Sequence, residues 1–125
     1  MGIVRTKARI GRDQDHLQEV EFLVDTGAFY TIVSPELCDG LGIELPLRDT
    51  VMTADSRRVE MPLGMAHIEI NGRQAGILVG ALDVPMPLLG VSALEALGFK
   101  VDPVGGRLEP TRPFPDIPAL ASTCP

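Results

Sequence analysis

The sequence predicts a mainly β fold with two short helices, formed as one domain per chain. Three observations lead to this prediction. The chain has 125 residues, which is enough for one compact domain and too few for two. Its 13 glycines and 11 prolines favour many turns and short strands over long helices. Aromatic residues make up only 4% of the chain, with no tryptophan, so the core must be built from aliphatic side chains.

Net charge and cysteine content argue against several classes of function. A formal net charge of −6 makes nucleic acid and anionic membranes poor partners, because both bind basic surfaces. No apolar run is long enough to span a bilayer. Cys38 and Cys124 lie far apart and share no metal-ligand spacing with His16 or His67. We therefore expect a reducing, cytoplasmic setting, no disulfide framework, no metal and no cofactor.

The first part of the chain carries the pattern of two strands followed by a helix. Residues 3–10 alternate apolar and polar side chains, which predicts the first strand. Over residues 18–25 the alternation gives way to a continuous apolar run, so the second strand enters the core as it approaches Asp25. A short helix is expected over residues 34–43. Its signals are Ser34 as the N-cap, Pro35 as the first residue, and Gly40 or Gly42 as the end.

Three hairpins are expected in the rest of the chain. The first covers residues 50–62. The second joins strands over 65–70 and 75–82 through an Asn-Gly pair, a strong signal for a tight turn. The third pairs residues 99–102 with 107–110. The residues at the three tips are Asp55, Ser56 and Arg57; Asn71 and Gly72; and Pro103, Val104, Gly105 and Gly106.

Two stretches of the sequence echo each other. They read "FLVDTGA" at 22–28 and "MPLLGVS" at 86–92, and each runs from apolar residues to a glycine and toward a short helix. The second helix is expected over 92–99, with Ser92 as its N-cap and Gly98 as its end. The echo indicates two halves of one domain related by an approximate two-fold axis.

A change in composition divides the chain into two parts. Residues 1–109 are expected to form the folded domain. Residues 110–125 contain five prolines among sixteen residues, which predicts an extended or disordered tail.

The stretch at 22–28 resembles the active-site loop of retropepsin-like aspartic proteases, the retroviral-type group also called clan AA. A second family landmark is "PLLG" at 87–90, two apolar residues and a glycine before a helix. The resemblance covers most of residues 3–109, and the chain looks like a single-domain member of a bacterial or archaeal branch. It implies a closed, barrel-like fold and an aspartic endopeptidase.

The resemblance assigns catalytic roles to Asp25, Thr26 and Gly27. Such catalysis needs two carboxylates that share one proton. No second Asp-Thr-Gly or Asp-Ser-Gly occurs in the chain, so the Asp25 side chains of a homodimer are expected to meet on its two-fold axis. In the family, the threonine hydroxyl hydrogen-bonds across to the partner chain. Ala28 offers no hydroxyl that would lower the pKa of Asp25, which favours a somewhat higher working pH.

The hairpin at 50–62 resembles the flap that covers an extended peptide or protein substrate. The residues expected to bind substrate are Ala28, Thr53, Ala54, Asp55, Met86 and Leu88. For Met86 and Leu88, ordinary core packing is an equally simple explanation. Arg57 and Arg58 either favour acidic side chains near the cleaved bond or are simply solvated, which is the commoner case.

The sequence departs from the retroviral pattern at one pair of positions. Phe29 and Val91 stand where the retroviral enzymes carry an acidic residue and an arginine, so an apolar contact is expected in place of an ion pair. Three other interpretations stay open. In one, the fold serves as a dimeric peptide-binding or assembly module whose activity is weak or lost. In another, the chain is a self-processing fragment of a polyprotein. In the last, Asp25 caps a turn, Gly27 supplies its φ angle, and nothing is catalysed.

Overall fold

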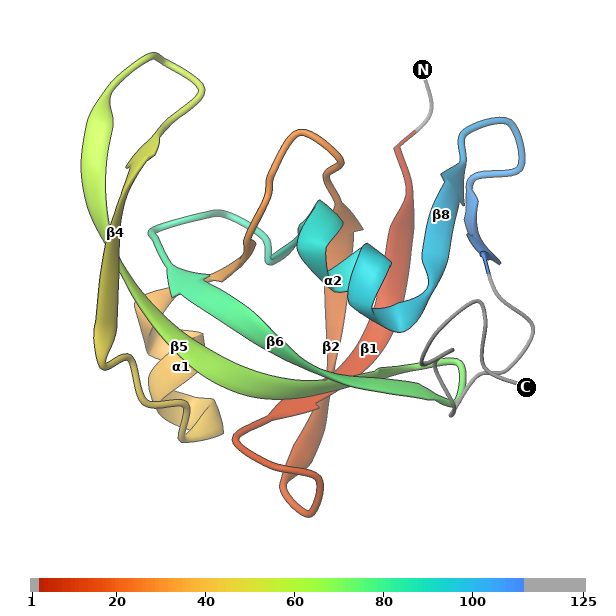
Figure 1. Ribbon diagram of the computed structural model, residues 1–125, viewed down its shortest axis with the longest axis horizontal. Coiled ribbons are helices and arrows are strands. Elements are labelled where there is room, and N and C mark those ends of the chain that lie inside the picture. The colour runs from red at the N-terminus through yellow and green to blue at the C-terminus, as the bar shows by residue number, and fades with distance from the viewer. Residues whose placement is uncertain (1–2, 112–125) are drawn as a thin grey trace, which may run out of the picture.

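The structure is a computed structural model that describes residues 3–111 (Figure 1). Its elements are β1 (Arg5–Gly11), β2 (Leu17–Val24), β3 (Thr31–Val33), α1 (Pro35–Leu41), β4 (Leu47–Met52), β5 (Arg58–Ile70), β6 (Arg73–Ala81), β7 (Leu88–Leu89), α2 (Val91–Leu97), β8 (Phe99–Asp102) and β9 (Arg107–Pro110). The expected mainly β fold with two short helices is confirmed.

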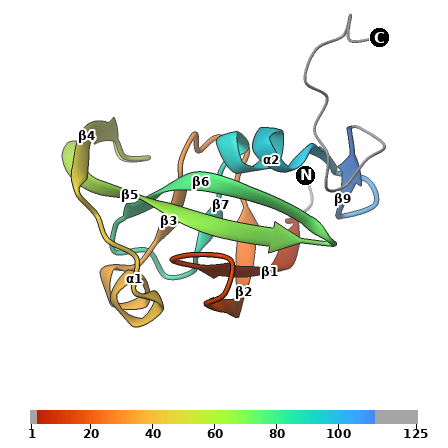
Figure 2. The same ribbon diagram turned by 60° about the horizontal axis from the view of Figure 1, so that its bottom comes forward.

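Seven strands form one mixed sheet that closes almost completely on itself. Their order is β1-β2-β7-β3-β6-β5-β4, and β1 also pairs with β5. This extra pairing runs from Arg9 opposite Glu69 to Gly11 opposite His67. It makes a barrel-like ring of every strand in the sheet except β4, which pairs with β5 at the end of the strand order. A separate hairpin consists of β8 and β9. In Figure 2, α2 lies above β6 and α1 lies below the same sheet.

The interior of the ring is mainly aliphatic, as the composition predicts. Phe22, Ile10 and Ile68 are fully buried, with no exposed area. Both helices close the core, α1 through Cys38 and α2 through Leu97. Burial raises the pKa of the Cys38 thiol to about 11. Within residues 3–111, no helix is long and apolar enough to cross a membrane.

The helix signals were read correctly for α1, whereas the predicted start of α2 is two residues too late. Ser34 caps α1, because its hydroxyl accepts a hydrogen bond from the Leu37 amide at 3.2 Å. Gly42, at φ 72°, ends this helix, and Gly40 lies inside it. The predicted Ser92 cap is wrong: Gly90 is the N-cap of α2, and Ser92 lies inside the helix. The Ser92 hydroxyl instead donates to the Phe29 carbonyl of the β2–β3 loop, a long-range partner that sequence reasoning did not foresee. Gly98 ends α2 at φ 78°, as expected.

Two predicted strands are one in the structure. The second arm of the 50–62 hairpin and the strand at 65–70 merge into β5, which has 13 residues. Pro62 is tolerated inside it because Pro62 pairs with β4, and pairing with β6 begins only at the next residue, Leu63. Gly64 is also required there, since an added Cβ would lie 1.8 Å from the Glu44 carbonyl oxygen.

The remaining hairpins agree with the sequence, with shifts at the ends. Asn71 and Gly72 form the β5–β6 turn with φ angles of 51° and 81°. β8 and β9 pair as predicted. The first strand begins at Arg5 and not at residue 3, although the Val4 carbonyl still accepts a hydrogen bond from Val24 at 2.8 Å. β9 ends at Pro110, and most of the predicted tail lies outside the described residues, so the domain boundary stays a prediction.

Candidate active site

The two echoing stretches of the sequence lie side by side in the fold. β2 and β7 pair in parallel, with Leu23 opposite Leu88 and Val24 opposite Leu89. The Asp25 amide then donates to the Leu89 carbonyl at 3.0 Å. Asp25 therefore leaves the sheet at the end of a paired strand, and the hydrogen bond to Leu89 of β7 fixes its backbone.

The Asp25 carboxylate is half-buried and has one local hydrogen bond. Its Oδ1 accepts from the Gly27 amide at 2.9 Å. The Asp25 carbonyl accepts from the Ala28 amide at 3.1 Å, which closes a tight turn. Gly27 does not adopt a positive φ, so the interpretation that it supplies a left-handed angle is wrong. Glycine at this position instead lets the backbone approach the Asp25 carboxylate closely. An added Cβ would lie 3.3 Å from Oδ1, which is tighter than most real contacts.

Backbone hydrogen bonds fix the loop that follows Asp25 to the start of α2. The Val91 amide donates to the Ala28 carbonyl at 2.8 Å. The Gly90 amide donates at 3.2 Å to the hydroxyl of Thr31, whose side chain is fully buried. Gly90 must be glycine, since a Cβ there would lie 2.3 Å from the Tyr30 carbonyl oxygen. This close approach is the physical reason for the glycine in the second landmark.

Backbone hydrogen bonds join the two segments that carry Phe29 and Val91. The Phe29 carbonyl accepts from the Ser92 amide at 3.1 Å. The Phe29 side chain is 60% exposed, and its ring packs edge to face against Tyr30 with centroids 5.1 Å apart. The apolar contact expected between Phe29 and Val91 stays a prediction.

The hairpin tip forms an ordered polar turn. The Thr53 amide donates to the Arg57 carbonyl at 2.8 Å, and the Ser56 amide donates to the Thr53 carbonyl at 3.0 Å. The Asp55 carboxylate accepts from the Thr53 hydroxyl and pairs with the Arg57 guanidinium at 2.9 Å. These bonds, led by the one from Thr53, lower the pKa of Asp55. Because Arg57 already has a partner within the tip, Arg58 is the more available cation of the two.

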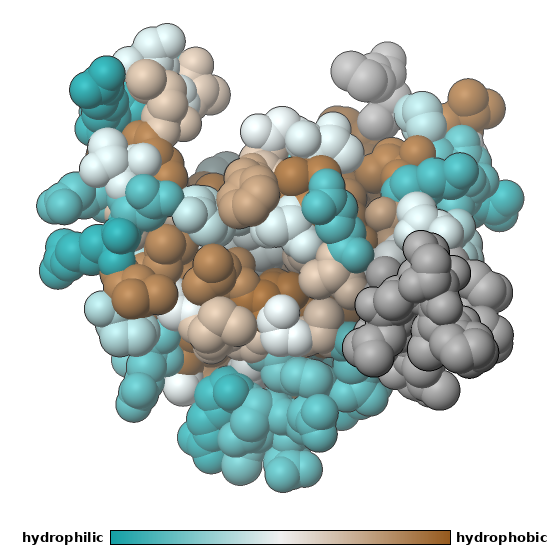
Figure 3. Space-filling model, viewed as in Figure 1, coloured by the Kyte–Doolittle hydropathy of each residue, from teal (hydrophilic) through white to brown (hydrophobic). Residues whose placement is uncertain are grey.

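The structure brings part of the predicted site together around Asp25. Strand pairing places Leu88 beside the end of β2, and the turn residue Met86 is half-buried just before it. The other predicted binding residues, Thr53, Ala54 and Asp55, lie at the hairpin tip between β4 and β5. In Figure 3 the hairpin, at upper left, stands away from the centre of the molecule across an open notch. Within residues 3–111, no hydrogen bond or ion pair joins the tip to the Asp25 loop.

One link between the loop and the hairpin was not predicted. The Tyr30 hydroxyl donates to Asp49 Oδ2 at 2.7 Å. This hydrogen bond is the main cause of a raised pKa for Tyr30. Asp49 lies in the middle of β4, where it pairs opposite Met61. No local pattern predicts this contact, because its partners are separated by 19 positions and meet only when the sheet folds.

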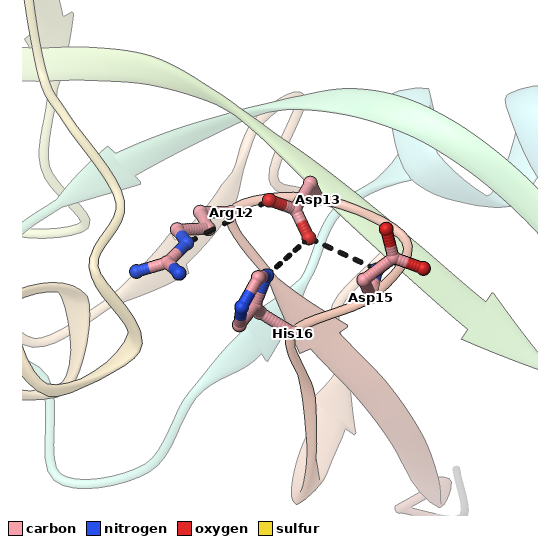
Figure 4. A network of polar contacts seen from close by, with 4 residues as sticks. All are labelled: Arg12, Asp13, Asp15 and His16. Atoms are coloured by element: carbon pink, nitrogen blue, oxygen red, sulfur yellow. Dashed lines mark hydrogen bonds and ion pairs between the residues drawn. The ribbon is translucent and has the colours of Figure 1, made fainter.

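A second polar cluster lies at the β1–β2 turn, shown in Figure 4. Asp13 accepts from the His16 ring at 2.7 Å and from the Asp15 amide at 2.9 Å, and Arg12 lies 3.6 Å from its other oxygen. The hydrogen bond with His16 is the main cause of a lowered pKa for Asp13. A shallow cavity of about 400 Å³ between this turn and α1 is lined by Arg12, His16 and Asp39. Residues of the Asp25 loop do not line it.

The chemistry available at Asp25 in this chain is that of a single carboxylate. Among the residues that the structure describes, no carboxylate or cation is paired with Asp25, and no group of His, Cys, Asp and Glu is arranged to hold a metal. The Thr26 side chain is exposed, and its hydroxyl has no hydrogen-bond partner within residues 3–111. Asp25 Oδ2 and Thr26 are thus both free to contact another molecule.

Comparison with known proteins places this site inside a family match. A family model described as "gag-polyprotein putative aspartyl protease" matches residues 15–96, about two thirds of the chain. The matched range contains both echoing stretches and the whole hairpin. A search of curated proteins finds no match.

Proposed function

The chain belongs to the gag-polyprotein aspartyl protease family, and on this basis we propose that it is an aspartic endopeptidase that works as a homodimer. The observation that carries the proposal is the state of Asp25. Its carboxylate stands half-exposed at the end of a paired strand, with Oδ1 held by Gly27 and Oδ2 without a partner in the described chain. A group placed in this way is suited to meet a second carboxylate.

In the proposed mechanism the Asp25 carboxylates of two copies share one proton. Like charges at close range cannot both ionise easily, so one carboxylate stays protonated. The ionised group draws a proton from water, and the protonated group polarises the scissile carbonyl. Gly27 donates to Asp25 Oδ1 and so fixes the direction of the other oxygen. The Thr26 hydroxyl is assigned a hydrogen bond to the partner chain, which would hold the two Asp25 loops together.

The proposed substrate is a peptide in extended conformation that lies under the hairpin. It would add its backbone to the strands, with side chains placed between the hairpin and the loop. The residues assigned to substrate binding are Ala28, Thr53, Ala54, Asp55, Met86 and Leu88. A cytoplasmic setting is part of the proposal, since Cys38 is a free thiol buried in the core. No cofactor, nucleic acid or membrane takes part.

The test is cleavage of denatured casein by the purified protein and by Asp25→Asn. We expect cleavage by the unmodified protein and loss of at least about a thousandfold in the variant, because removal of one member of a catalytic unit removes most of its effect. Asp39→Asn, at an exposed carboxylate in α1, is the matched control and should retain full activity. Equal rates of cleavage by the unmodified protein and by Asp25→Asn would contradict the proposal.

The hairpin tip favours a second candidate, a dimeric peptide-binding or assembly module whose catalytic activity is weak or lost. The tip is a charged turn closed by Asp55 and Arg57, and its geometry does not rest on glycine. Peptide binding measured by calorimetry, combined with no cleavage by the unmodified protein, would favour this candidate. A mass shift during purification that is absent from Asp25→Asn would instead point to self-processing.

A further inference from the structure

We propose that Tyr30 is a positioning residue that holds the hairpin at a set distance from the Asp25 loop by donating its hydroxyl to Asp49. This inference rests on the proposed function, because it concerns the placement of substrate between the hairpin and Asp25. It adds two residues, Tyr30 and Asp49, that were not expected from the sequence.

Both partners are placed by elements that cannot easily shift. Tyr30 follows Asp25 by five positions and comes directly before β3, and its carbonyl lies against Gly90 at the start of α2. Its ring also packs against Phe29. Asp49 is in the middle of β4, in register with Met61 of β5. The 2.7 Å hydrogen bond therefore joins the catalytic loop to a strand of the hairpin.

The hairpin has little else to hold it against the ring. β4 pairs with β5 along one edge. Within residues 3–111, the Tyr30–Asp49 hydrogen bond is the one side-chain hydrogen bond or ion pair that leaves the segment from Leu47 to Glu60. The other polar contacts of the segment, made by Thr53, Asp55 and Arg57, stay inside its tip. Figure 1 shows the hairpin projecting beyond the rest of the sheet, as this arrangement requires.

The consequence concerns substrate binding more than the chemical step. Without the link, the hairpin samples more orientations, and each substrate must restrict it on binding. Within residues 3–111, the Tyr30 hydroxyl bonds to Asp49 and the Asp25 carboxylate to Gly27, so loss of the Tyr30 hydroxyl leaves the hydrogen bond of the reacting group in place. Loss of the link should therefore raise KM and leave kcat nearly constant.

The first experiment asks whether the hydrogen bond exists in solution. Tyr30 is the only tyrosine and the chain has no tryptophan, so its ionisation can be followed alone by ultraviolet absorbance. In the unmodified protein the titration midpoint should lie above the ordinary value of about 10. In Asp49→Ala it should fall toward that value. Equal midpoints in the two proteins would overturn the link.

The second experiment asks whether the link positions the hairpin. Tyr30→Phe keeps the ring against Phe29 and removes only the hydroxyl. With a fluorescent casein substrate, this variant and Asp49→Ala should each raise KM by about two- to tenfold, the value of one hydrogen bond, with kcat within about twofold. The double variant should be no worse than either single variant, because both remove the same bond.

A matched control separates this effect from a general loss of stability. Arg9→Gln removes another exposed ion pair, the one to Glu69 at 2.9 Å, far from the hairpin tip. It should change neither KM nor kcat. A raised midpoint in the unmodified protein, together with a KM that is unchanged in Tyr30→Phe, would overturn the positioning role. Absence of cleavage by the unmodified protein would instead contradict the proposed function, while the absorbance titration would still decide whether the link exists.

Discussion

At the scale of single residues, close approach explains the two glycines of the candidate site better than backbone angles do. Gly27 and Gly90 flank the candidate site, and neither has a positive φ. Each has a close neighbour: an added Cβ would make a tight contact of 3.3 Å with the Asp25 carboxylate at Gly27 and would overlap the Tyr30 carbonyl oxygen, 2.3 Å away, at Gly90. The second contact is with backbone, which cannot move aside without moving the whole loop.

Gly90→Ala should therefore destabilise the protein strongly. Its Cβ would lie 2.3 Å from the Tyr30 carbonyl oxygen, so we expect a loss of about 3 kcal/mol in the free energy of unfolding, measured by urea denaturation. Gly76→Ala in β6 is the matched control, because its Cβ would meet only the Met65 methyl at 3.8 Å. That change should alter the free energy by less than about 1 kcal/mol. Equal losses in the two variants would contradict this explanation of Gly90.

At the scale of elements, the caps of the two helices differ in kind. Ser34 caps α1 with its own hydroxyl, whereas the N-cap of α2 is Gly90, which has no side chain to offer. Backbone contacts with the β2–β3 loop take the place of a side-chain cap in α2. The start of α2 should therefore depend on the loop, and the start of α1 on Ser34 itself.

Ser34→Ala should lower the free energy of unfolding by about 1 kcal/mol, since the Leu37 amide loses its acceptor. Ser34→Asp keeps an acceptor at the same position and should retain most of the stability. Thermal unfolding followed by circular dichroism measures both. A loss in Ser34→Asp as large as that in Ser34→Ala would show that the serine acts through something other than capping.

Local signals in the sequence were enough for most elements and not for the contacts between them. Turn pairs such as Asn71 and Gly72, and the cap at Ser34, act over a few residues and were predicted correctly. The Ser92 cap was wrong because the Phe29 carbonyl, far away in sequence, takes its hydroxyl. The Tyr30–Asp49 bond was missed for the same reason. The catalytic assignments of Asp25, Thr26 and Gly27 rest on the motif, and they stay predictions until activity is measured.

At the scale of the whole molecule, the proposed site is complete only when two copies meet. Addition of an excess of Asp25→Asn to the unmodified protein should then abolish casein cleavage, because mixed dimers contain one Asp25 and not two. A monomeric enzyme would keep its activity in the same mixture. Sedimentation of the unmodified protein should show a dimer at the concentration used in the assay.

The ring also constrains how the chain can reach its native state. It closes where β1 meets β5, and the Arg9–Glu69 pair at this seam is separated by 60 positions in sequence. Contacts between such distant segments carry a large loop-closure entropy, so we expect folding in milliseconds to seconds and not in microseconds. During synthesis, β1 leaves the ribosome well before its second neighbour. Until β5 has followed, the edge of β1 that faces away from β2 stays unpaired, and this is the stage at which chaperones would be expected to bind the nascent chain.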